Sequence, residues 1–408
     1  MNLGSHEANT HRPLVFFDFM THYGGSFQST VLLLSKLQEH TDVAVVDVYG
    51  ACAQYIADLH ELGIKTVKLF PSWSGRTTIG GRGNWMRRMQ QLLLSIPSQI
   101  DIALRLRAVL RTMKPRALWV NSEKALFTAW LAAPRSLPLA VYVRGELQAI
   151  RPLCFFAWRR ANGAIGVSQE SLSYLRTTTF AQRNLHVVYN GADVDRTIER
   201  ARPAPVGALF HHPGCLRVVI PGRLTPEKGH EIGMQAVARF IEQGGRAELC
   251  IAGDVMPGAS SDYFESLLAF RSKLKMDEYI HFLGWRNDIL SVLRVADIVV
   301  LTSHFGEGLP RSLIEAMSLG KPVIATRSGG VPELVRDGLD GYLVEIGDID
   351  GITKALSLLQ SPADRKEMGL AGAQRIRSVF RLEAQSRQFL KVMDQIAYES
   401  GSNAMYYS

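Results

Sequence analysis

Residues 303–317 read SHFGEGLPRSLIEAM, and this stretch says more about the fold than any other part of the chain. Pro310 is well suited to the first position of a helix, because its ring fixes φ and its missing N–H group is not needed there. Gly320, followed by a lysine and a proline, is typical of the end of a helix. The stretch therefore predicts a loop that leads into a short helix over residues 310–319.

Two glutamates lie eight residues apart in this stretch. Glu307 falls on the predicted loop and Glu315 falls within the predicted helix. The N-terminus of a helix binds phosphate, because its free N–H groups and its positive dipole end point toward the ligand. One carboxylate beside such a site and another a turn or so along the helix would hold hydroxyl groups on either side of a pyrophosphate. The alternative is an amphipathic helix with a solvated glutamate at each end.

The same segment resembles the Glu-x7-Glu signature of the retaining family 4 glycosyltransferases, also called glycosyl transferases group 1. The sequences that flank it, Phe-Gly-Glu-Gly-Leu-Pro and Glu-Ala-Met-Ser-Leu-Gly-Lys-Pro, fit the family as well. The family has the two-domain GT-B fold. The resemblance implies that Glu307 orients the hydroxyls of a donor sugar and that Glu315 holds ribose hydroxyls. It also implies donor contacts from the residues around Glu307, namely Gly306, Gly308, Leu309 and Pro310.

The chain has 408 residues, which is too long for one ordinary core and favours two domains. Short apolar runs rich in β-branched residues, such as residues 43–48 and 217–221, alternate with longer amphipathic stretches. Continuous apolar strands separated by helices are typical of parallel sheets covered on both faces. Because the pattern occurs twice, we predict an α/β chain of two doubly wound, Rossmann-like domains. The resemblance implies that these domains face each other across a cleft, as in the GT-B fold.

Composition predicts the boundary between the two domains. Residues 201–207 read ARPAPVG, a Pro- and Ala-rich sequence that is typical of a linker. We therefore predict an N-terminal domain over residues 1–200, a linker over residues 201–216 and a second domain over residues 217–381. The resemblance implies that the first domain binds the acceptor and that the second binds the nucleotide-sugar donor. The resemblance implies that residues 382–408 form a helix that crosses back to the first domain.

A second motif, PGRLTPEKGH, lies at residues 221–230 between a predicted strand and a predicted helix. Gly222 permits a close approach of the backbone. Arg223 offers a planar fork for phosphate oxygens and Lys228 adds a compact charge, so together they would neutralise a leaving pyrophosphate. The segment resembles the family's Gly-Arg-Leu…Lys-Gly motif, whose Arg and Lys contact the donor diphosphate. The alternative is that both are ordinary turn residues.

Other candidate donor contacts follow predicted strands, where ligands bind in open parallel sheets. Tyr-Gly-Gly-Ser at residues 23–26 resembles the flexible Gly-Gly loop of the family's first domain, although a dinucleotide fingerprint would need a third glycine. In the family, the chain just after the strand predicted at residues 280–283 contacts the nucleotide base. This makes Trp285 or Arg286 a candidate, with a core position as the alternative for the tryptophan. The remaining donor candidates are Gly24, Gly25, Gly253 and Asp254.

The chain departs from the family at residue 144. Many family members have a histidine that contacts the donor sugar at the end of this predicted strand, whereas here the position holds Arg144. A guanidinium would suit a carboxylated sugar or acceptor, or would pair with Glu146. His22 and His304 are alternative sources of an imidazole, although a lone histidine is more often structural.

Basic charge is concentrated in the first half of the chain. Residues 1–200 contain 23 Lys and Arg against 14 Asp and Glu, a net charge of +9, whereas residues 201–408 have a net charge of −1. Residues 65–118 carry 11 basic residues and a single acid, Asp101. Three interpretations remain open: the segment docks on an anionic membrane surface, it holds an acidic acceptor, or it forms the solvated faces of two helices. Nucleic acid is not expected as a partner, because no recognised binding motif accompanies the charge.

Cysteine content and hydropathy bear on the location. The four cysteines have no paired spacing, which argues against a disulfide framework or a zinc site and fits a reducing compartment. The N-terminus is polar, and no stretch reaches the roughly 18 apolar residues of a membrane span. We therefore expect no signal peptide and a cytoplasmic protein, peripheral to the inner face of a membrane if the basic segment docks there.

Together these motifs predict a retaining glycosyltransferase that moves a sugar from a UDP- or GDP-sugar to an acceptor hydroxyl. The catalytic set would be Glu307, Arg223 and Lys228, and no metal or cofactor is expected, since no Asp-x-Asp site stands out. The acceptor would be a glycan or a lipid-linked glycan in polysaccharide, lipopolysaccharide or glycolipid biosynthesis. Two alternatives are a nucleotide-sugar epimerase of the same fold, which would turn over donor without acceptor, and an inactive sugar- or lipid-binding protein.

Overall fold

The computed structural model describes residues 12–19, 25–70, 85–150, 154–178, 180, 184–256 and 258–406. These residues form two compact units. Unit 1 comprises residues 1–167, 172–188 and 385–408, and unit 2 comprises residues 168–171 and 189–384. The chain therefore passes between the units more than once, and unit 1 is completed by the C-terminal end of the chain.

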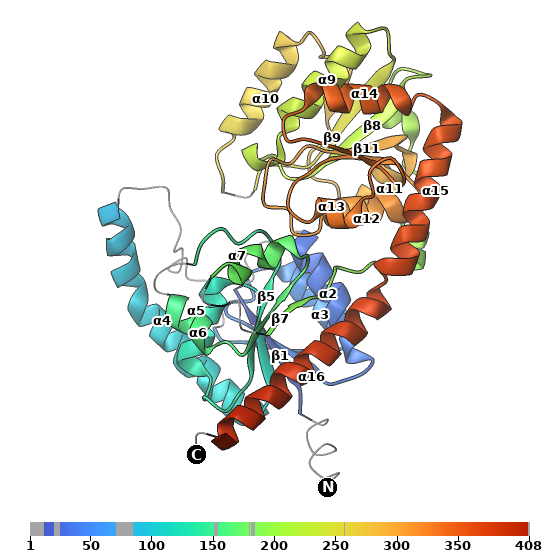
Figure 1. The fold of residues 1–408 in the computed structure, drawn as a ribbon. Helices are drawn as coiled ribbons and strands as arrows, with labels where there is room; N and C mark the ends of the chain where they lie inside the picture. The colour runs from blue at the N-terminus through green and yellow to red at the C-terminus, as the bar shows by residue number, and fades with distance from the viewer. Residues whose placement is uncertain are drawn as a thin grey trace. The chain divides into compact units, whose positions relative to one another are not determined.

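Unit 1 contains a parallel sheet of short strands (Figure 1), which are buried except for the two at its edges, β3 and β7. Its described strands pair in the order β3-β2-β1-β4-β5-β6-β7. Phe16 and Val45 are neighbours across β1 and β2, and Trp119 faces Phe16 on the other side across β1 and β4. The strands are β1 (Leu14–Asp18), β2 (Val43–Asp47), β3 (Lys65–Lys68), β4 (Ala117–Val120), β5 (Leu139–Val143), β6 (Gly163–Gly166) and β7 (Asn184–Val187).

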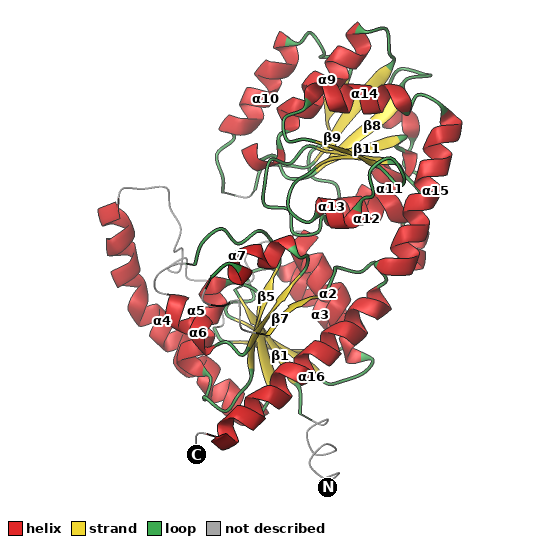
Figure 2. Cartoon of the chain, viewed as in Figure 1, coloured by secondary structure: helices red, strands yellow, loops and turns green. Residues whose placement is uncertain are grey.

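Helices cover both faces of this sheet (Figure 2). α16 (Leu382–Tyr406) supplies Phe389, whose ring centroid lies 4.7 Å from that of Trp119 and 5.7 Å from that of Tyr142. All three rings are almost fully buried, so the C-terminal helix is part of the core of unit 1. The other helices are α2 (Gly25–Gln38), α3 (Ala53–Glu61), α4 (Trp85–Met113), α5 (Glu123–Ala132), α6 (Phe155–Arg160) and α7 (Ser173–Arg176).

Unit 2 contains a second parallel sheet, with its described strands in the order β10-β9-β8-β11-β12-β13. This is the strand order of the doubly wound dinucleotide-binding fold. Its core is aliphatic and includes Val218, Leu249 and Val300. The strands are β8 (Leu216–Pro221), β9 (Ala247–Ala252), β10 (Ile280–Phe282), β11 (Ile298–Leu301), β12 (Val323–Thr326) and β13 (Tyr342–Val344).

The helices of unit 2 flank the sheet on both faces (Figure 2). Those that follow β8 and β11 matter most for the site, because they start at the carboxyl edge of the sheet. The helices are α8 (Val194–Arg200), α9 (His230–Glu242), α10 (Asp262–Lys273), α11 (Ile289–Val295), α12 (Arg311–Ser318), α13 (Val331–Leu334), α14 (Ile349–Leu358) and α15 (Pro362–Val379).

The strand order reverses between β8 and β11, which are neighbours in the sheet although β9 and β10 lie between them in sequence. Ligands of open parallel sheets bind outside the carboxyl ends of the strands at such a reversal. In unit 2 this point is formed by the segments that follow Pro221 and Leu301. Both sequence motifs, at residues 221–230 and 303–317, therefore fall at the place where the topology expects a ligand.

The predicted fold class is confirmed, and the expected helix over residues 310–319 is present as α12, with Pro310 as its N-cap. The division between the units differs from the predicted one: it falls after Val188 instead of at residues 201–216. Those residues pack on unit 2, where Leu209 and Phe210 are buried and the Leu209 carbonyl accepts a hydrogen bond from the Cys250 thiol at 3.1 Å. Proline and alanine content indicated a linker, but the apolar residues that follow it anchor the segment.

Candidate functional site

Two loops at the strand-order reversal of unit 2 are joined by an ion pair. Lys228 ends the loop after β8, Glu307 lies on the loop after β11, and the Lys228 ammonium contacts Glu307 Oε1. Ser303 donates a hydrogen bond of 2.6 Å to the same oxygen. Among the described residues, none donates to Glu307 Oε2, and the ion pair uses only one of the three N–H bonds of the lysine. A cation and a carboxylate are thus held in fixed positions with bonding capacity to spare.

The loop after β8 approaches its neighbour so closely that only glycine fits. A Cβ atom on Gly253 would lie 1.7 Å from the carbonyl oxygen of Gly222. Gly222 N donates to Ala252 O at 3.0 Å and Leu224 N donates to Asp254 O at 3.0 Å, so the pairing of β8 with β9 continues past the ends of both strands. Arg223, between these two contacts, is exposed. The backbone is therefore fixed while the guanidinium reaches solvent, where its Nη1 lies 3.0 Å from Met256 Sδ.

The loop after β11 is fixed by hydrogen bonds from the end of β12 and from the residues that follow it. Thr326, at the end of β12, donates to Ser303 O at 2.6 Å, and Gly330 N donates to Glu307 O at 2.9 Å. A Cβ atom on Gly329 would lie 1.8 Å from that same Glu307 oxygen. Glu307 is 8% exposed. These contacts fix the backbone of Glu307, and its side chain is only 10% exposed.

Glu315 lies one turn into α12 and is 7% exposed. Arg311 Nε lies 2.8 Å from Glu315 Oε1, which makes an ion pair, although the N–H bond does not point at the oxygen and no hydrogen bond forms. Asn190 Nδ2 donates to Leu309 O at 3.2 Å, which fixes the chain just before the helix. The predicted pair of glutamates is thus present, one on the loop and one in the helix, and both carboxylates are largely desolvated.

His230 is a buried residue that sequence reasoning did not single out. It begins α9 directly after Gly229, is fully buried, and its Nε2 has no hydrogen-bond partner among the described residues. Burial, and then the charge of Lys228, lower the pKa of His230 to about 4. The imidazole is therefore neutral at neutral pH, and it lies close enough to Lys228 for the charge of the lysine to lower its pKa. Its position after a Lys-Gly turn was the only available signal, and histidine at a helix start has no specific meaning in sequence.

The candidates for base contact lie at the outer edge of the site. Gly253 and Gly284 form an isolated β-bridge, so the segments after β9 and β10 are neighbours. Trp285 is 50% exposed, which overturns the alternative that it belongs to the core. Its Nε1 donates to Asn287 Oδ1 at 2.8 Å, and Arg286 makes two hydrogen bonds to Asp288, of 2.8 and 2.7 Å. Both side chains are held by neighbours in sequence.

His304 lies next to the first loop. The backbone N–H group of His304 donates to the carbonyl oxygen of Glu227 at 2.9 Å. A Cβ atom on Gly229 would lie 2.6 Å from the ring nitrogen His304 Nε2. The residue therefore fastens the loop after β11 to the turn that carries Lys228. Gly306, which follows, has a φ of 83°, a left-handed conformation that favours glycine.

The candidates in the first half of the chain belong to unit 1. Arg144 follows β5, and its Nη1 donates to the hydroxyl of Thr30 on α2. Its guanidinium carbon lies 5.2 Å from the ring centroid of Tyr142. Gly25 begins α2. His22 and Gly24 lie outside the described residues.

Polar side chains gather at the carboxyl edge of the unit 1 sheet. Asp18, at the end of β1, accepts hydrogen bonds from Phe19 N at 2.8 Å and from Ser122 Oγ at 3.1 Å. Burial raises the pKa of Asp18, and the charge of Arg144 opposes this rise. Burial also lowers the pKa of Lys124 to about 8, and its ammonium lies 4.1 Å from the Phe19 ring centroid. Sequence reasoning found only Arg144 of this group, because the other residues come from separate strands and helices.

Several basic side chains of residues 65–118 make ion pairs, hydrogen bonds or ring contacts within unit 1. Arg105 pairs with Asp101 at 3.1 Å and lies 4.4 Å from the Phe70 ring centroid. Arg107 donates to the carbonyl oxygens of residues 131 and 132, and Arg116 pairs with Asp394 on α16. Arg76 and Arg82 lie outside the described residues. The described part of the segment thus has structural contacts, and docking on a membrane stays a prediction.

Two features are absent from the described residues. No helix there is long and apolar enough to span a membrane. No group of three or more His, Cys, Asp or Glu side chains in the described ranges is arranged to hold a metal ion.

Known families match both halves of the chain. Residues 23–196 match the family described as Glycosyltransferase Family 4, and residues 216–361 match the family described as Glycosyl transferases group 1. The first match covers most of unit 1 and the beginning of unit 2, and the second covers most of unit 2. The second match contains both motifs, the one at residues 221–230 and the one at residues 303–317.

Individual relatives match over part of their length. The N-acetyl-alpha-D-glucosaminyl L-malate synthase of Bacillus anthracis is 31% identical over 151 residues, which is 37% of this chain and 38% of that protein. The UDP-Gal:alpha-D-GlcNAc-diphosphoundecaprenol alpha-1,3-galactosyltransferase of Escherichia coli is 33% identical over 139 residues, 33% of this chain and 34% of that protein. The chain thus spans between a third and two fifths of the length of these two curated relatives.

A solved structure matches over the whole fold. The crystal structure of Alr3699/HepE of Anabaena, in complex with UDP and glucose, superimposes with a TM-score of 0.75. The match covers 94% of this chain and 100% of that one, at 20% sequence identity. Its likeness therefore establishes the architecture, the GT-B fold of two Rossmann-like domains.

Proposed function

Because the chain belongs to the glycosyltransferases of family 4 and group 1, we propose that it transfers a sugar from a nucleotide-diphosphate donor to an acceptor hydroxyl. We propose further that the anomeric configuration of the sugar is retained and that no metal ion is required. The product belongs to glycan biosynthesis, in a polysaccharide, a lipopolysaccharide or a glycolipid.

One observation supports this function above the others: Lys228 and Glu307 meet at the strand-order reversal of unit 2. In the proposed reaction, the bond between the anomeric carbon and the diphosphate oxygen breaks, and negative charge grows on the diphosphate. Lys228 has two N–H bonds left to donate to those oxygens, and the exposed Arg223 lies on the same loop after β8. Preorganised cations at such a position stabilise the charge of the transition state without the cost of reorganising solvent.

Glu307 has a second task in this proposal. Its Oε1 is occupied by Lys228 and Ser303, and its Oε2 accepts from no described residue. A sugar hydroxyl is the donor that would fit this oxygen. Because the carboxylate is held from two sides, it orients the sugar, and we do not propose it as a nucleophile.

Glu315 is proposed to hold the ribose of the nucleotide. Its carboxylate is largely buried beside Arg311, and no described residue donates a hydrogen bond to its Oε2, which would accept from a ribose hydroxyl. The N-terminus of α12 lies between the two glutamates in sequence and adds free N–H groups for a phosphate. Trp285 and Arg286, at the outer edge, are candidates for the base.

We propose a UDP- or GDP-sugar as the donor. The Anabaena structure was solved with UDP and glucose, and the galactosyltransferase of Escherichia coli has a UDP-sugar in its name. That second relative also names a diphosphoundecaprenol acceptor, which supports a lipid-linked glycan as the acceptor here. The acceptor would bind to unit 1, and the basic residues 65–118 would dock the protein on an anionic membrane surface.

Thermal unfolding in the presence of nucleotides tests the proposal. UDP, GDP and ADP are added without metal to the wild type, to Arg223→Ala, and to Arg239→Ala as a matched control in the same unit. A ligand at about 100 times its dissociation constant stabilises the fold by roughly 2.7 kcal/mol, which moves the transition clearly. We expect a shift with one nucleotide that persists in Arg239→Ala and shrinks in Arg223→Ala. No shift with any nucleotide would contradict the assigned donor site.

Transfer itself is tested with the nucleotide that binds. Donor sugars of that nucleotide are incubated with the enzyme and with lipid-linked or free glycan acceptors, and the products are separated by mass. Acceptor-dependent consumption of donor supports a transferase. Conversion of the donor sugar in the absence of acceptor would instead identify an epimerase and would overturn the proposal.

A further inference from the structure

Unit 2 contains a cavity of about 870 Å³ at the edge of its sheet opposite the candidate donor site. Its lining comes from the segment at residues 206–217, which leads into β8, from Arg246 before β9, from Asp297 before β11, and from the start of α15. All of these lie at the amino ends of strands or beyond them, whereas Lys228 and Glu307 follow carboxyl ends. In a parallel sheet these are opposite edges, so the cavity is a separate place in the fold.

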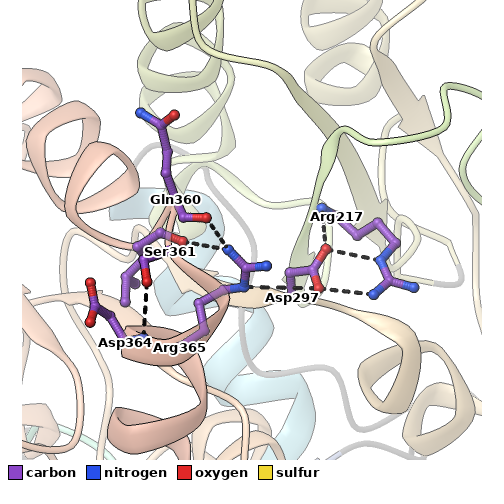
Figure 3. A network of polar contacts seen from close by, with 7 residues as sticks. Arg217, Asp297, Gln360, Ser361, Asp364 and Arg365 are labelled. Atoms are coloured by element: carbon purple, nitrogen blue, oxygen red, sulfur yellow. Dashed lines mark hydrogen bonds and ion pairs between the residues drawn. The ribbon is translucent and has the colours of Figure 1, made fainter.

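Three arginines line this cavity, and each is fixed by one part of its guanidinium. Arg217 donates from Nε and Nη2 to the two oxygens of Asp297, both at 2.9 Å. Arg365 donates from Nη1 to the carbonyl oxygens of residues 359 and 360, at 2.8 and 2.7 Å. Arg246 donates from Nη2 to Pro213 O at 2.9 Å. Figure 3 shows Arg217 and Arg365 on either side of the Asp297 carboxylate.

Each of these guanidinium groups keeps N–H bonds that no described residue uses. They are those of Arg217 Nη1, of Arg365 Nη2, and of Arg246 Nε and Nη1. Arg246 is exposed, and the side chains of Arg217 and Arg365 are 32% and 16% exposed. The donors are therefore accessible from the cavity, and their positions are set before any ligand arrives.

The charge around the cavity is positive. Asp297 is the sole carboxylate among the described residues that line it, against three arginines. Lys321, which precedes β12, is affected by the same positive charge. Burial lowers the pKa of Lys321, and the charge of Asp297 opposes this shift. The charges of Arg217, Arg294 and Arg365 lower the pKa further. Arg217, Arg294, Arg365 and Lys321 therefore lie close enough to interact, and Asp297 is the carboxylate among them. An anion in the cavity would relieve this repulsion.

The wall of the cavity is preformed by a buried acid. Glu248 on β9 is fully buried and accepts the backbone N–H groups of His211 at 2.7 Å and His212 at 2.8 Å. These bonds hold the lining segment against the sheet. Phe210 and Pro362 add apolar surface to the lining. Preformed concave sites of a few hundred Å³, with apolar walls and a few convergent polar groups, are typical of small-molecule binding.

We propose that this cavity is a second ligand site, which binds a phosphate-bearing small molecule through Arg217, Arg246 and Arg365. Guanidinium groups match the oxygens of a phosphate, and several of them around one cavity favour a phosphomonoester or a diphosphate over a singly charged carboxylate. The apolar wall would accept the organic part of the ligand. The proposal concerns a different edge of the sheet from the donor site and does not depend on the transferase activity.

Calorimetric titration with inorganic pyrophosphate tests the site in the full chain. Arg223→Gln serves as the background, because it weakens the proposed donor site, where pyrophosphate would also bind. We expect one binding event to remain in this background and its affinity to fall about tenfold or more when Arg246→Gln is added, since a charge-assisted hydrogen bond is lost. Arg239→Gln removes the same charge elsewhere in unit 2 and should change the affinity less than about twofold.

Arg365→Lys provides a second variant that keeps the charge and loses the planar guanidinium. Weaker binding in this variant would therefore come from lost hydrogen-bond geometry and not from lost charge. Circular dichroism checks that each variant is folded. Absence of any binding in the Arg223→Gln background would overturn the proposal. Binding that neither Arg246→Gln nor Arg365→Lys weakens would overturn it as well.

A phosphate group reaches such a cavity either on a soluble molecule or on a lipid headgroup. Sedimentation with phosphatidylcholine vesicles, with and without phosphatidic acid, separates the two sources. Sedimentation that needs phosphatidic acid, is lost in Arg246→Gln and is competed by pyrophosphate assigns the site to a headgroup. Pyrophosphate binding without such sedimentation assigns it to a soluble phosphorylated ligand.

Discussion

Lys228 and Glu307 form an ion pair although 79 residues separate them in the sequence. Each follows one of the two central strands of unit 2, so the pair exists because β8 and β11 are neighbours where the strand order reverses. Ser303 donates to the same carboxylate oxygen from the start of the second loop. The pair joins the two sequence motifs into one site, and it sets what each residue should do when it is changed.

Replacing Glu307 with glutamine should remove most of the transfer activity. The amide keeps an oxygen for Ser303 but loses the charge that holds Lys228, and it presents an N–H₂ group or a weaker acceptor to the sugar. We expect kcat to fall about a hundredfold or more, since loss of a preorganised polar group at a reacting centre has that size of effect. Steady-state release of the nucleotide diphosphate measures it, with the exposed Glu265→Gln as control. A folded Glu307→Gln protein of wild-type rate would remove Glu307 from the site.

Replacing Glu315 with glutamine should act on binding more than on rate. The carboxylate lies beside Arg311 at one side of the site and would meet the ribose, which takes no part in the chemistry. We expect the dissociation constant of the nucleotide to rise about tenfold, which corresponds to one hydrogen bond to a charged group. Calorimetric titration with the nucleotide diphosphate gives this value directly. Unchanged affinity together with a lower kcat would assign Glu315 to the reaction step instead.

Chelation of divalent cations should leave the rate unchanged. In the proposed mechanism Arg223, Lys228 and helix N-termini stabilise the diphosphate, so protein groups do the work that Mg²⁺ does in other enzymes. The rate of acceptor-dependent turnover is compared in EDTA and in added Mg²⁺. A strict requirement for the metal would contradict the assignment of those residues.

His230 should make unit 2 less stable as the pH falls. The imidazole is neutral when folded, with a pKa of about 4, whereas an unfolded histidine has a pKa of about 6.5. Between these values the unfolded state binds more protons, so stability rises with pH and is lost as the pH drops. The expected change from this residue is about 2 kcal/mol between pH 7 and pH 5.

Urea unfolding at both pH values, in the wild type and in His230→Gln, measures that contribution. Glutamine does not titrate, so the variant should lose less stability than the wild type on going to pH 5. Equal losses in the two proteins would show that the buried imidazole already carries a proton in the folded state.

Gly253 should not tolerate alanine. The new Cβ atom would lie 1.7 Å from Gly222 O, which is backbone and has no room to move without shifting Arg223. We expect a loss of stability of about 2 kcal/mol or more, together with weaker nucleotide binding. Gly207→Ala is the matched control, because its Cβ would meet no atom within 4 Å. Equal unfolding midpoints for the two variants would contradict the close approach of these loops.

Much of the fold could be predicted from sequence alone because the strands are buried on both faces. The run at Val43–Asp47, for example, has three valines and an alanine before its final aspartate, a composition typical of a strand that is buried on both faces. The helix α12 could be predicted almost to the residue, since proline before a helix and glycine after it have strong local preferences. The end of unit 1 was less predictable, because burial of Leu209 and Phe210 depends on contacts far along the chain.

The site was predictable to the extent that it is local. Lys228 and Glu307 were each recognised from the residues beside them, but no sequence pattern says that they touch. The neutral state of His230 and the polar contacts of Asp18 arise from burial, which only the packed structure defines. The arginines of the second cavity were also invisible in sequence, since Arg217, Arg246 and Arg365 come from three separate segments and none belongs to a motif.

The C-terminal helix α16 gives the chain an unusual order of assembly. Phe389 packs against Trp119 and Tyr142 in the core of unit 1, yet it follows the whole of unit 2 in the sequence. Unit 2 is therefore synthesised before Phe389, so it can fold while unit 1 still lacks one helix of its core. A shortened product that stops before Gln385 would therefore expose the aromatic core of unit 1 to solvent. Such a product would be a substrate for chaperones and proteases, even though every residue of the proposed donor site is already in place.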